Sequence, residues 1–193
     1  MRQYIHNEIA KSLTTIQLLA ADNNIAAVVE QVAKACCTAL RSGKKILLAG
    51  NGGSAADAQH LAGELVSRLN FDRPGLPAFA LTTDSSVLTA IGNDYGYEKL
   101  FARQVNALGT AGDIFIAIST SGRSPNILRA LEEARRKGLV SVGLTGMSGG
   151  DMASLCDHCI RIPSAETPKI QEGHIILGHI ICGLIECEIF HGD

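Results

Sequence analysis

Two pairs of polar side chains in this sequence have the spacing of metal ligands. His60 and Glu64 are four residues apart in a stretch of helical periodicity, so the imidazole and the carboxylate point to the same side of the helix. Gln171 and His179 are eight residues apart in a later helical stretch, about 80° apart around the axis and therefore on one broad face. Nitrogen and oxygen donors from two helices suit a divalent metal ion. The four side chains are therefore candidate ligands of one such ion.

Each of these residues also has an ordinary structural interpretation. Glu64 can lie on a solvated helix face, His60 can cap a helix, and Gln171 can stand in a first turn. His179 can be a hydrogen-bonded core imidazole, and for any one residue alone the structural role is favoured. An unpaired polar group in an apolar stretch is costly, however, and both Glu64 and His179 are surrounded by apolar residues. Together the four favour a shared site.

The other histidines are left out of this metal set. His174 lies about 140° from His179 around the same helix, so the two imidazoles cannot easily face one ion. His6, His158 and His191 have no comparable partner in the pattern.

Two loops rich in glycine and serine each follow a short apolar run. Their sequences are Gly50-Asn51-Gly52-Gly53-Ser54-Ala55 and Ser119-Thr120-Ser121-Gly122-Arg123-Ser124-Pro125. In the second loop, hydroxyls, free backbone N–H groups and a helix dipole converge, which suits a phosphate monoester and lacks the lysine of a P-loop. A hydroxyl-rich capping turn is the structural alternative.

The first loop also matches the G-x-G-x-x-A pattern of dinucleotide-binding proteins. In that case an acidic ribose ligand should end the next strand about 20 residues later. The next predicted strand ends near Asp84, about 30 residues on, which weakens the match. A nicotinamide dinucleotide site and a plain glycine turn remain alternatives at this loop.

Short apolar runs alternate with helical stretches along most of the chain, which predicts a parallel sheet covered by helices on both faces. We expect a three-layer α/β/α sandwich of about five parallel strands, preceded by two helices. The predicted strands are 45–49, 78–81, 114–118, 140–144 and 159–162, and the predicted helices are 3–20, 23–41, 55–69, 85–107, 125–137, 151–155 and 168–190. Ligands of such sheets bind at the carboxyl ends of the strands, where both loops would lie.

Composition narrows the class of protein. The 193 residues suggest one domain over 1–193, with residues 1–42 as a leading helical pair. A formal net charge of −2 provides no basic field for nucleic acid. No export signal is visible at the N-terminus, and the least polar run, residues 173–185, is shorter than the ~20 residues that span a bilayer. We therefore expect a cytoplasmic protein that binds neither nucleic acid nor membrane.

Six cysteines in such a chain are expected to be reduced thiols. Cys156 and Cys159 nevertheless form a C-x-x-C pair that Cys182 and Cys187 could complete as a structural zinc site. Small buried apolar side chains are the favoured interpretation of these residues.

Four segments in order, GNGGSAADAQHLAGEL, AIGNDYG, STSGRSPN and IQEGHIILGH, closely resemble the phosphoheptose isomerases of the sugar isomerase (SIS) superfamily. The resemblance covers nearly the whole chain. It implies an SIS-type, flavodoxin-like fold and conversion of sedoheptulose 7-phosphate to D-glycero-D-manno-heptose 7-phosphate, for bacterial lipopolysaccharide or capsule. It also implies one Zn²⁺ per subunit and a homotetramer with sites at subunit interfaces.

The resemblance also implies roles for particular residues. The metal ligands would be His60, Glu64, Gln171 and His179, with Glu64 and Gln171 also contacting substrate. Phosphate contacts would be Ser119, Thr120, Ser121 and Ser124, and sugar contacts would be Asn51, Gly52, Gly53, Asn93 and Asp94.

An aldose-ketose isomerisation needs a base and an acid, for which Glu64 and His179 are the candidates. The alternative function is that of a non-catalytic SIS protein, either a phosphosugar binder or a relative associated with a replication initiator. Relatives of the latter kind lack the catalytic Glu and His, so the presence of Glu64 and His179 favours an enzyme.

Overall fold

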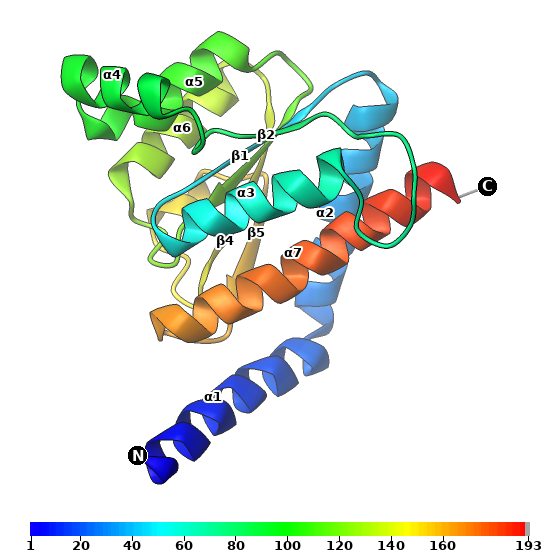
Figure 1. Cartoon of the computed structure of the whole chain (residues 1–193), viewed down its shortest axis with the longest axis vertical. Coiled ribbons are helices and arrows are strands. Elements are labelled where there is room, and N and C mark those ends of the chain that lie inside the picture. Colours follow the sequence, from blue (N-terminus) through cyan, green and yellow to red (C-terminus); the bar gives the residue numbers. More distant parts are fainter. Residues whose placement is uncertain (192–193) are drawn as a thin grey trace.

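The computed structural model of the protein describes residues 1–191, which form a parallel sheet of five strands covered by helices on both faces (Figure 1). The strand order is β2-β1-β3-β4-β5, the flavodoxin-like order, and the predicted α/β/α fold is confirmed. The strands are β1 Ile46–Gly50, β2 Ala78–Ala80, β3 Ile114–Ile118, β4 Val140–Gly146 and β5 His158–Ile162. The helices are α1 Arg2–Ala21, α2 Asn23–Arg41, α3 Gly53–Val66, α4 Ser85–Tyr95, α5 Leu100–Leu108, α6 Pro125–Arg136 and α7 Thr167–Phe190, with short 3-10 turns η1 Tyr97–Lys99 and η2 Asp151–Ser154. Residues 192 and 193 of the predicted domain lie outside the described part of the chain.

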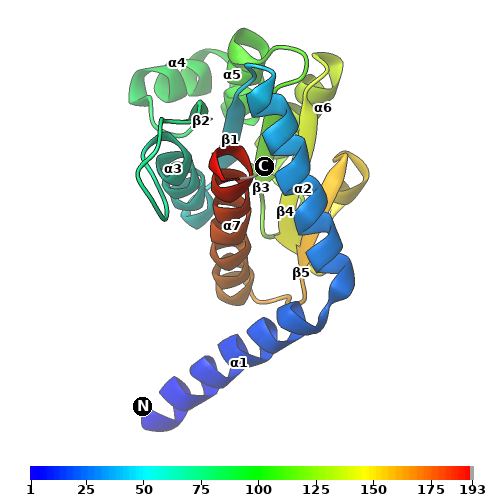
Figure 2. The ribbon, with the colours of Figure 1, turned by 90° about the vertical axis from the view of Figure 1, so that its right-hand side faces the viewer.

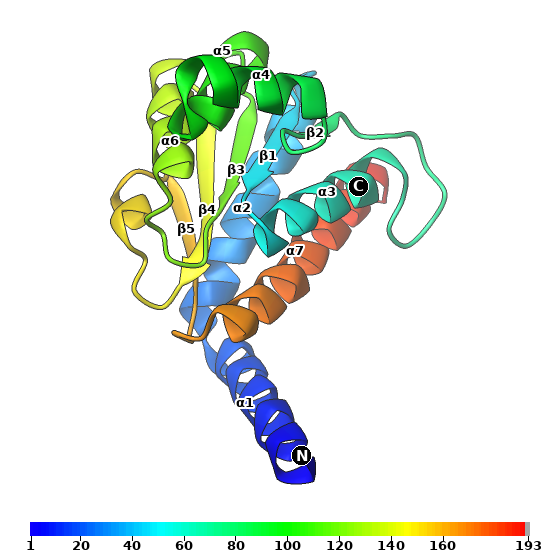
Figure 3. The same cartoon turned by 60° about the vertical axis from the view of Figure 1, so that its left-hand side comes forward.

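Alternate side chains of the central strands point into two separate cores. Ile46 and Leu48 of β1 face the core formed with α2, α3 and α7, whereas Leu47 and Ala49 face the core formed with α4, α5 and α6. Figure 3 shows the sheet between these two helical layers. Because both faces are covered, all five residues of β1 and of β3 are buried, which explains their continuous apolar sequences.

The sheet register places the two glycine- and serine-rich loops side by side. In the parallel pair of β1 and β3, Gly50 lies opposite Ile118. The loops that follow these residues therefore leave neighbouring strands at the same edge of the sheet, as the sequence predicts.

Three predicted helices differ from the structure. The predicted helix 85–107 is divided into α4, η1 and α5, because Gly96 takes a φ of +86° that breaks the helix. The predicted helix 151–155 is the short 3-10 turn η2. The predicted helix 55–69 begins earlier, at Gly53, and ends earlier, at Val66.

The helix α1 projects from the body of the molecule (Figures 1 and 2). Asp22 ends it and caps α2, accepting hydrogen bonds from the backbone N–H groups of Asn24 and Ile25. Apolar side chains on α1, including Ile5, Ile9 and Leu13, are more than half exposed.

The last helix, α7, is longer than the apolar run in the sequence suggested. Its 24 residues are long and apolar enough to cross a membrane, by length and composition alone. In the fold α7 lies against α2 and α3 over one face of the sheet (Figure 2), and Ile170, Ile181 and Ile185 are buried there. These apolar residues of α7 are therefore part of the protein core.

Candidate active site

Three of the four predicted metal ligands meet between α3 and α7. His60 Nε2 lies 2.7 Å from His179 Nε2 and 3.2 Å from Glu64 Oε1. One donor atom from each of the three residues can be chosen so that all lie within 4.8 Å of one another. The side chain of His60 is 47% exposed and that of Glu64 is 19% exposed. The cluster is therefore open to solvent at His60, while the Glu64 carboxylate is partly shielded from solvent. Two imidazoles and a carboxylate at this spacing fit a divalent ion.

Close contact between the two helices makes this meeting possible. α3 and α7 lie side by side along their length (Figures 1 and 3). A Cβ atom on Gly178 would lie 2.7 Å from Leu61 Cδ2, so the glycine allows α7 to approach α3 directly beside His179. His60 is adjacent to Leu61 in sequence and is carried into the same contact.

Gln171 lies two turns before His179 on α7, against the start of α3. A Cβ atom on Gly53 would collide with the Gln171 side-chain amide. The predicted ligand Gln171 is thus in contact with Gly53, a predicted sugar contact in the first loop. The absence of a side chain at position 53 leaves room for this amide.

The second loop forms the turn that the sequence predicts at the start of α6. Ser119 Oγ and Ser124 Oγ are 3.0 Å apart, and the Arg123 N–H donates to Ser121 Oγ at 3.2 Å. Pro125 is the first residue of α6, so the exposed Ser121 hydroxyl lies near a helix N-terminus. This arrangement suits an anion, because the dipole and the hydroxyls act in the same place.

The two loops are joined by side chains of which the sequence analysis identified only one. Asn51 and Asn126 exchange two amide hydrogen bonds of 2.9 Å each. The Tyr97 hydroxyl donates a third, also 2.9 Å, to Asn51 Oδ1. Tyr97 belongs to no quoted motif, whereas Asn126 is the last residue of the segment STSGRSPN but was assigned no role.

The predicted sugar contacts Asn93 and Asp94 are not joined to this network. They are exposed on α4, and Asn93 Nδ2 donates to Asp94 Oδ1 at 2.8 Å. Their neighbour Gly92 lines a pocket at the end of β1 together with Asn51 and Tyr97. Leu88 and Thr89 of α4 also line this pocket, whereas Asn93 and Asp94 are not among its lining residues.

The structure separates His174 from the cluster. Its imidazole is fully buried, and Nε2 donates to the Thr145 carbonyl at 3.2 Å. Burial lowers the pKa of His174 to about 4, so the ring is neutral near pH 7. His174 is thus a core residue, and its separation from the cluster is what its angular position on the helix predicted.

The alternative zinc site of four cysteines is wrong. Cys156 and Cys159 flank the start of β5, whereas Cys182 and Cys187 lie on α7, and all four are free thiols. Burial raises the pKa of Cys156 and of Cys182 to about 12, which favours the protonated thiols. Within residues 1–191, the His60, Glu64 and His179 group is the one cluster of His, Cys, Asp and Glu donors with metal-site spacing.

The acidic residue considered for a dinucleotide has a structural role. Asp84 caps α4 by accepting a hydrogen bond of 3.0 Å from the Val87 N–H. This interaction accounts for an acidic residue at the end of β2 without a ribose.

Comparisons with known proteins identify the family of the chain. The family model of the SIS domain matches residues 8–146. The phosphoheptose isomerase of Burkholderia pseudomallei strain 1710b is 63% identical over 187 residues, covering 97% of this chain and 95% of that protein. The phosphoheptose isomerase of Aneurinibacillus thermoaerophilus is 60% identical over 190 residues, covering 98% and 96%. The solved structure of phosphoheptose isomerase GmhA from Neisseria gonorrhoeae is 40% identical and superimposes with a TM-score of 0.90, covering 96% of this chain and 98% of that one.

Proposed function

The chain belongs to the phosphoheptose isomerases of the SIS-domain family, and we propose that it converts sedoheptulose 7-phosphate to D-glycero-D-manno-heptose 7-phosphate. It is accordingly an isomerase of sugar phosphates. The observation that carries the proposed reaction is the meeting of Glu64 and His60 on α3 with His179 on α7. A binding protein without chemistry does not require a carboxylate and two imidazoles at one point.

The reaction moves a proton between adjacent carbons through an enediol, while protons also shift between the two oxygens. We assign the carbon-bound proton to Glu64, whose carboxylate is mostly shielded from water by α3 and α7. His179 is the proposed acid on the oxygen side, because its ring lies beside Glu64 from the opposite helix.

A divalent metal fits the donor set of this cluster. His60, Glu64, Gln171 and His179 are the proposed ligands of one Zn²⁺ per subunit. When bound, Zn²⁺ would supply Lewis-acid polarisation of the substrate carbonyl. The protein's part is to present two imidazoles, a carboxylate and an amide from two packed helices.

The phosphate group gives the substrate its orientation. In the proposal it binds Ser119, Thr120, Ser121 and Ser124 at the N-terminus of α6, while Asn51, Gly52, Gly53, Asn93 and Asp94 contact the sugar. Binding energy at the phosphate then orients the reacting carbons toward Glu64. The side-by-side exit of the two loops from β1 and β3 supports this division.

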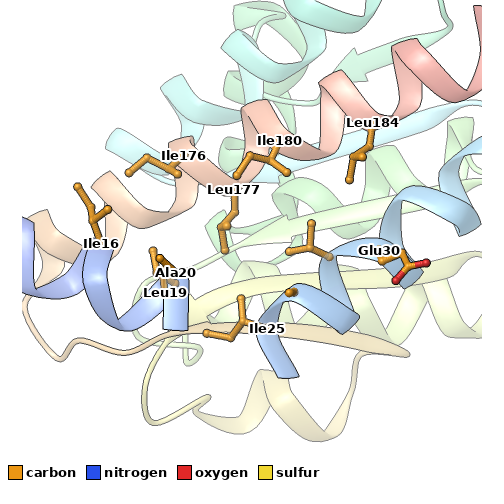
Figure 4. Close-up of a pocket in the computed structure, with 11 residues that line it drawn as sticks. Ile16, Leu19, Ala20, Ile25, Glu30, Ile176, Leu177, Ile180 and Leu184 are labelled. Carbon is orange, nitrogen blue, oxygen red and sulfur yellow. The ribbon is translucent and has the colours of Figure 1, made fainter. Parts of the chain in front are cut away.

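An apolar groove supports the proposed homotetramer. It is lined by residues of α1, α2 and α7, among them Ile16, Ile25, Ile176, Ile180 and Leu184 (Figure 4). Exposed apolar surface of this kind marks a protein contact, and a second copy of the chain is the proposed occupant. We propose that the whole chain acts as one SIS unit in the cytoplasm, in heptose synthesis for lipopolysaccharide or capsule.

The proposed reaction is tested with purified protein of defined zinc content and sedoheptulose 7-phosphate. The expected product is a heptose 7-phosphate of the manno configuration, identified by NMR. Binding of the sugar phosphate without conversion would instead indicate a non-catalytic SIS protein.

The role of Glu64 is tested by isotope exchange. We expect Glu64→Gln to lower kcat by about 10²- to 10⁴-fold, because an amide cannot accept the proton. The reaction is run in D₂O, and deuterium at the reacting carbon is measured by NMR. Deuterium incorporation at the wild-type rate in Glu64→Gln would exclude Glu64 as the base.

A further inference from the structure

The loop between α3 and β2, residues 67–77, is anchored by a buried ion pair that the proposed reaction does not use. Arg73 Nε donates to Glu186 Oε1 of α7 at 3.0 Å. The side chains are 2% and 0% exposed, respectively, so both charges are removed from water. Such a pair is costly unless its remaining polar atoms are also satisfied.

The remaining nitrogens of Arg73 bind the end of α3. One guanidinium nitrogen donates to the Leu65 carbonyl at 2.6 Å, and the other donates to the Glu64 carbonyl at 2.8 Å. The last carbonyls of a helix have no partner within it, and the helix dipole places partial negative charge there. Arg73 therefore caps α3 at the residue that carries the proposed base.

The carboxylate of Glu186 is equally well satisfied. It accepts hydrogen bonds from the backbone N–H groups of Leu69 and Asn70, at 3.0 and 2.8 Å. Burial raises the pKa of Glu186, but these two N–H groups and Arg73 outweigh it and keep the pKa below its ordinary value. Glu186 thus carries a full negative charge at the point where α7 meets the loop.

We propose that Arg73 and Glu186 are positioning residues that fix the end of α3 against α7, and so fix Glu64 and His60 relative to His179. This inference rests on the proposed isomerase and metal site. Besides the meeting of His60 with His179, the two helices are joined by the contacts of Gly53 with Gln171, of Leu61 with Gly178, and of the α3 C-terminus with Glu186 through Arg73. In the last of these, charged groups make directional hydrogen bonds.

Geometry, rather than stability, is the main contribution expected of this pair. Replacing a buried ion pair by apolar side chains of similar volume is often neutral for stability. A guanidinium, however, holds two carbonyl oxygens and a carboxylate in one fixed orientation, which the single ammonium of lysine cannot do. Loss of these hydrogen bonds from the Arg73 guanidinium therefore frees the last turn of α3, where Glu64 lies.

The test uses the full chain with Co²⁺ as the metal probe, because its visible spectrum reports ligand geometry. The variants are Arg73→Lys, which keeps the charge, and the double change Arg73→Met with Glu186→Leu, which avoids an unpaired buried charge. Circular dichroism and thermal melts establish that each variant is folded before the titration.

Two controls separate positioning from general destabilisation. Glu188→Gln removes an ion pair from the same helix, but its pair with Arg41 is exposed, at 55% and 51%. Leu131→Ala creates a cavity in the other core, on α6. Both should bind Co²⁺ with wild-type affinity and spectrum.

We expect the Arg73 and Arg73/Glu186 variants to bind Co²⁺ about 10- to 100-fold more weakly, as seen when residues that orient metal ligands are changed, and with an altered spectrum. Their kcat should fall while KM for the sugar phosphate changes little, because the phosphate loop lies on β3 and α6. Folded variants with the wild-type Co²⁺ affinity and spectrum would overturn the inference. Lack of Co²⁺ binding by the wild type would overturn it as well.

The Co²⁺ titration is independent of the reaction. If the wild type binds Co²⁺ but converts no sedoheptulose 7-phosphate, the proposed function fails, and the comparison of Co²⁺ affinities still decides the role of Arg73.

Discussion

Each face of the sheet packs against an apolar core, but the helices that cover the two faces differ in buried charge. On the face covered by α2, α3 and α7, the buried residues of α7 include the charged side chains of Lys169 and Glu186. On the face covered by α4, α5 and α6, the buried polar side chains of the described helices are the neutral amides of Gln104 and Asn126. Among the described helices, buried charge therefore gathers on the side where the proposed ligands lie.

This difference indicates that the two helical layers have different roles. An apolar contact tolerates small displacements, whereas a hydrogen-bonded charge has a narrow optimal geometry. The α4–α6 layer can stabilise the sheet without positioning the proposed metal ligands, because its proposed contacts are with the phosphate and the sugar. The α3 and α7 layer must do both, so changes there should alter chemistry as well as stability.

The largest expected effect comes from matched cavities in the two cores. Leu61→Ala on α3 and Leu131→Ala on α6 should each lower the free energy of unfolding by about 2–5 kcal/mol, because both side chains are buried. Leu61 contacts Gly178 beside His179, so Leu61→Ala should also lower kcat. Leu131→Ala should leave kcat unchanged below its melting temperature.

These two variants are compared by denaturant unfolding and by steady-state kinetics at one temperature where both are folded. Equal losses of kcat in the two variants would show that the two faces of the sheet are not functionally distinct.

The next effect is pH-dependent and belongs to His174. Its pKa is lowered by burial from 6.5 to about 4 in the folded protein. Between these pH values the unfolded chain binds a proton at His174 that the folded chain does not. The contribution of the neutral ring to the free energy of unfolding is therefore complete above pH 6.5 and is lost as the pH falls toward 4. The full contribution is about 3 kcal/mol.

His174→Gln should therefore flatten the fall of stability between pH 6.5 and 4, although it lowers stability near neutral pH. Urea unfolding across this range measures the slope. His6→Gln, at an exposed position on α1, is the control and should retain the wild-type slope. An unchanged slope in His174→Gln would mean that the imidazole is not buried in its neutral form.

The smallest effect is expected where charge is exposed. Lys11 on α1 lies 2.9 Å from Glu166, with both side chains about half exposed. Glu166→Gln should cost only about 0.2–1 kcal/mol, because such pairs are screened by solvent. Thermal melts at low and high salt measure it, and a loss above this range would show that α1 depends on this single pair for its position.

Periodicity and residue type predicted most of the fold and the core of the site. The alternation of apolar runs and helices gave the parallel sheet, and helix geometry brought His60 next to Glu64. The meeting of these residues with His179 depended on helix packing, which no local pattern encodes. Gly178 is an example: it allows close packing because it has no side chain, so that Leu61 of α3 can lie against the backbone of α7.

Contacts between residues far apart in the sequence were not predicted. Asn126 ends a quoted motif without an assigned role and Arg73 has no motif, and their partners Asn51 and Glu186 are 75 and 113 residues away. The broken helix at Gly96 was also missed, because a single glycine is tolerated within a helical pattern and the positive φ that breaks the helix cannot be seen in the sequence.

The break at Gly96 leaves α4 as a short helix with one buried residue, Ile91. A helix with so little buried surface opens locally at a lower free-energy cost than α3 or α7, and its amide hydrogens exchange with solvent sooner. A sugar bound at the proposed contacts Asn93 and Asp94 would stabilise α4 and make its local unfolding rarer. Amide exchange in α4 would then register occupancy of the sugar site even when no reaction takes place.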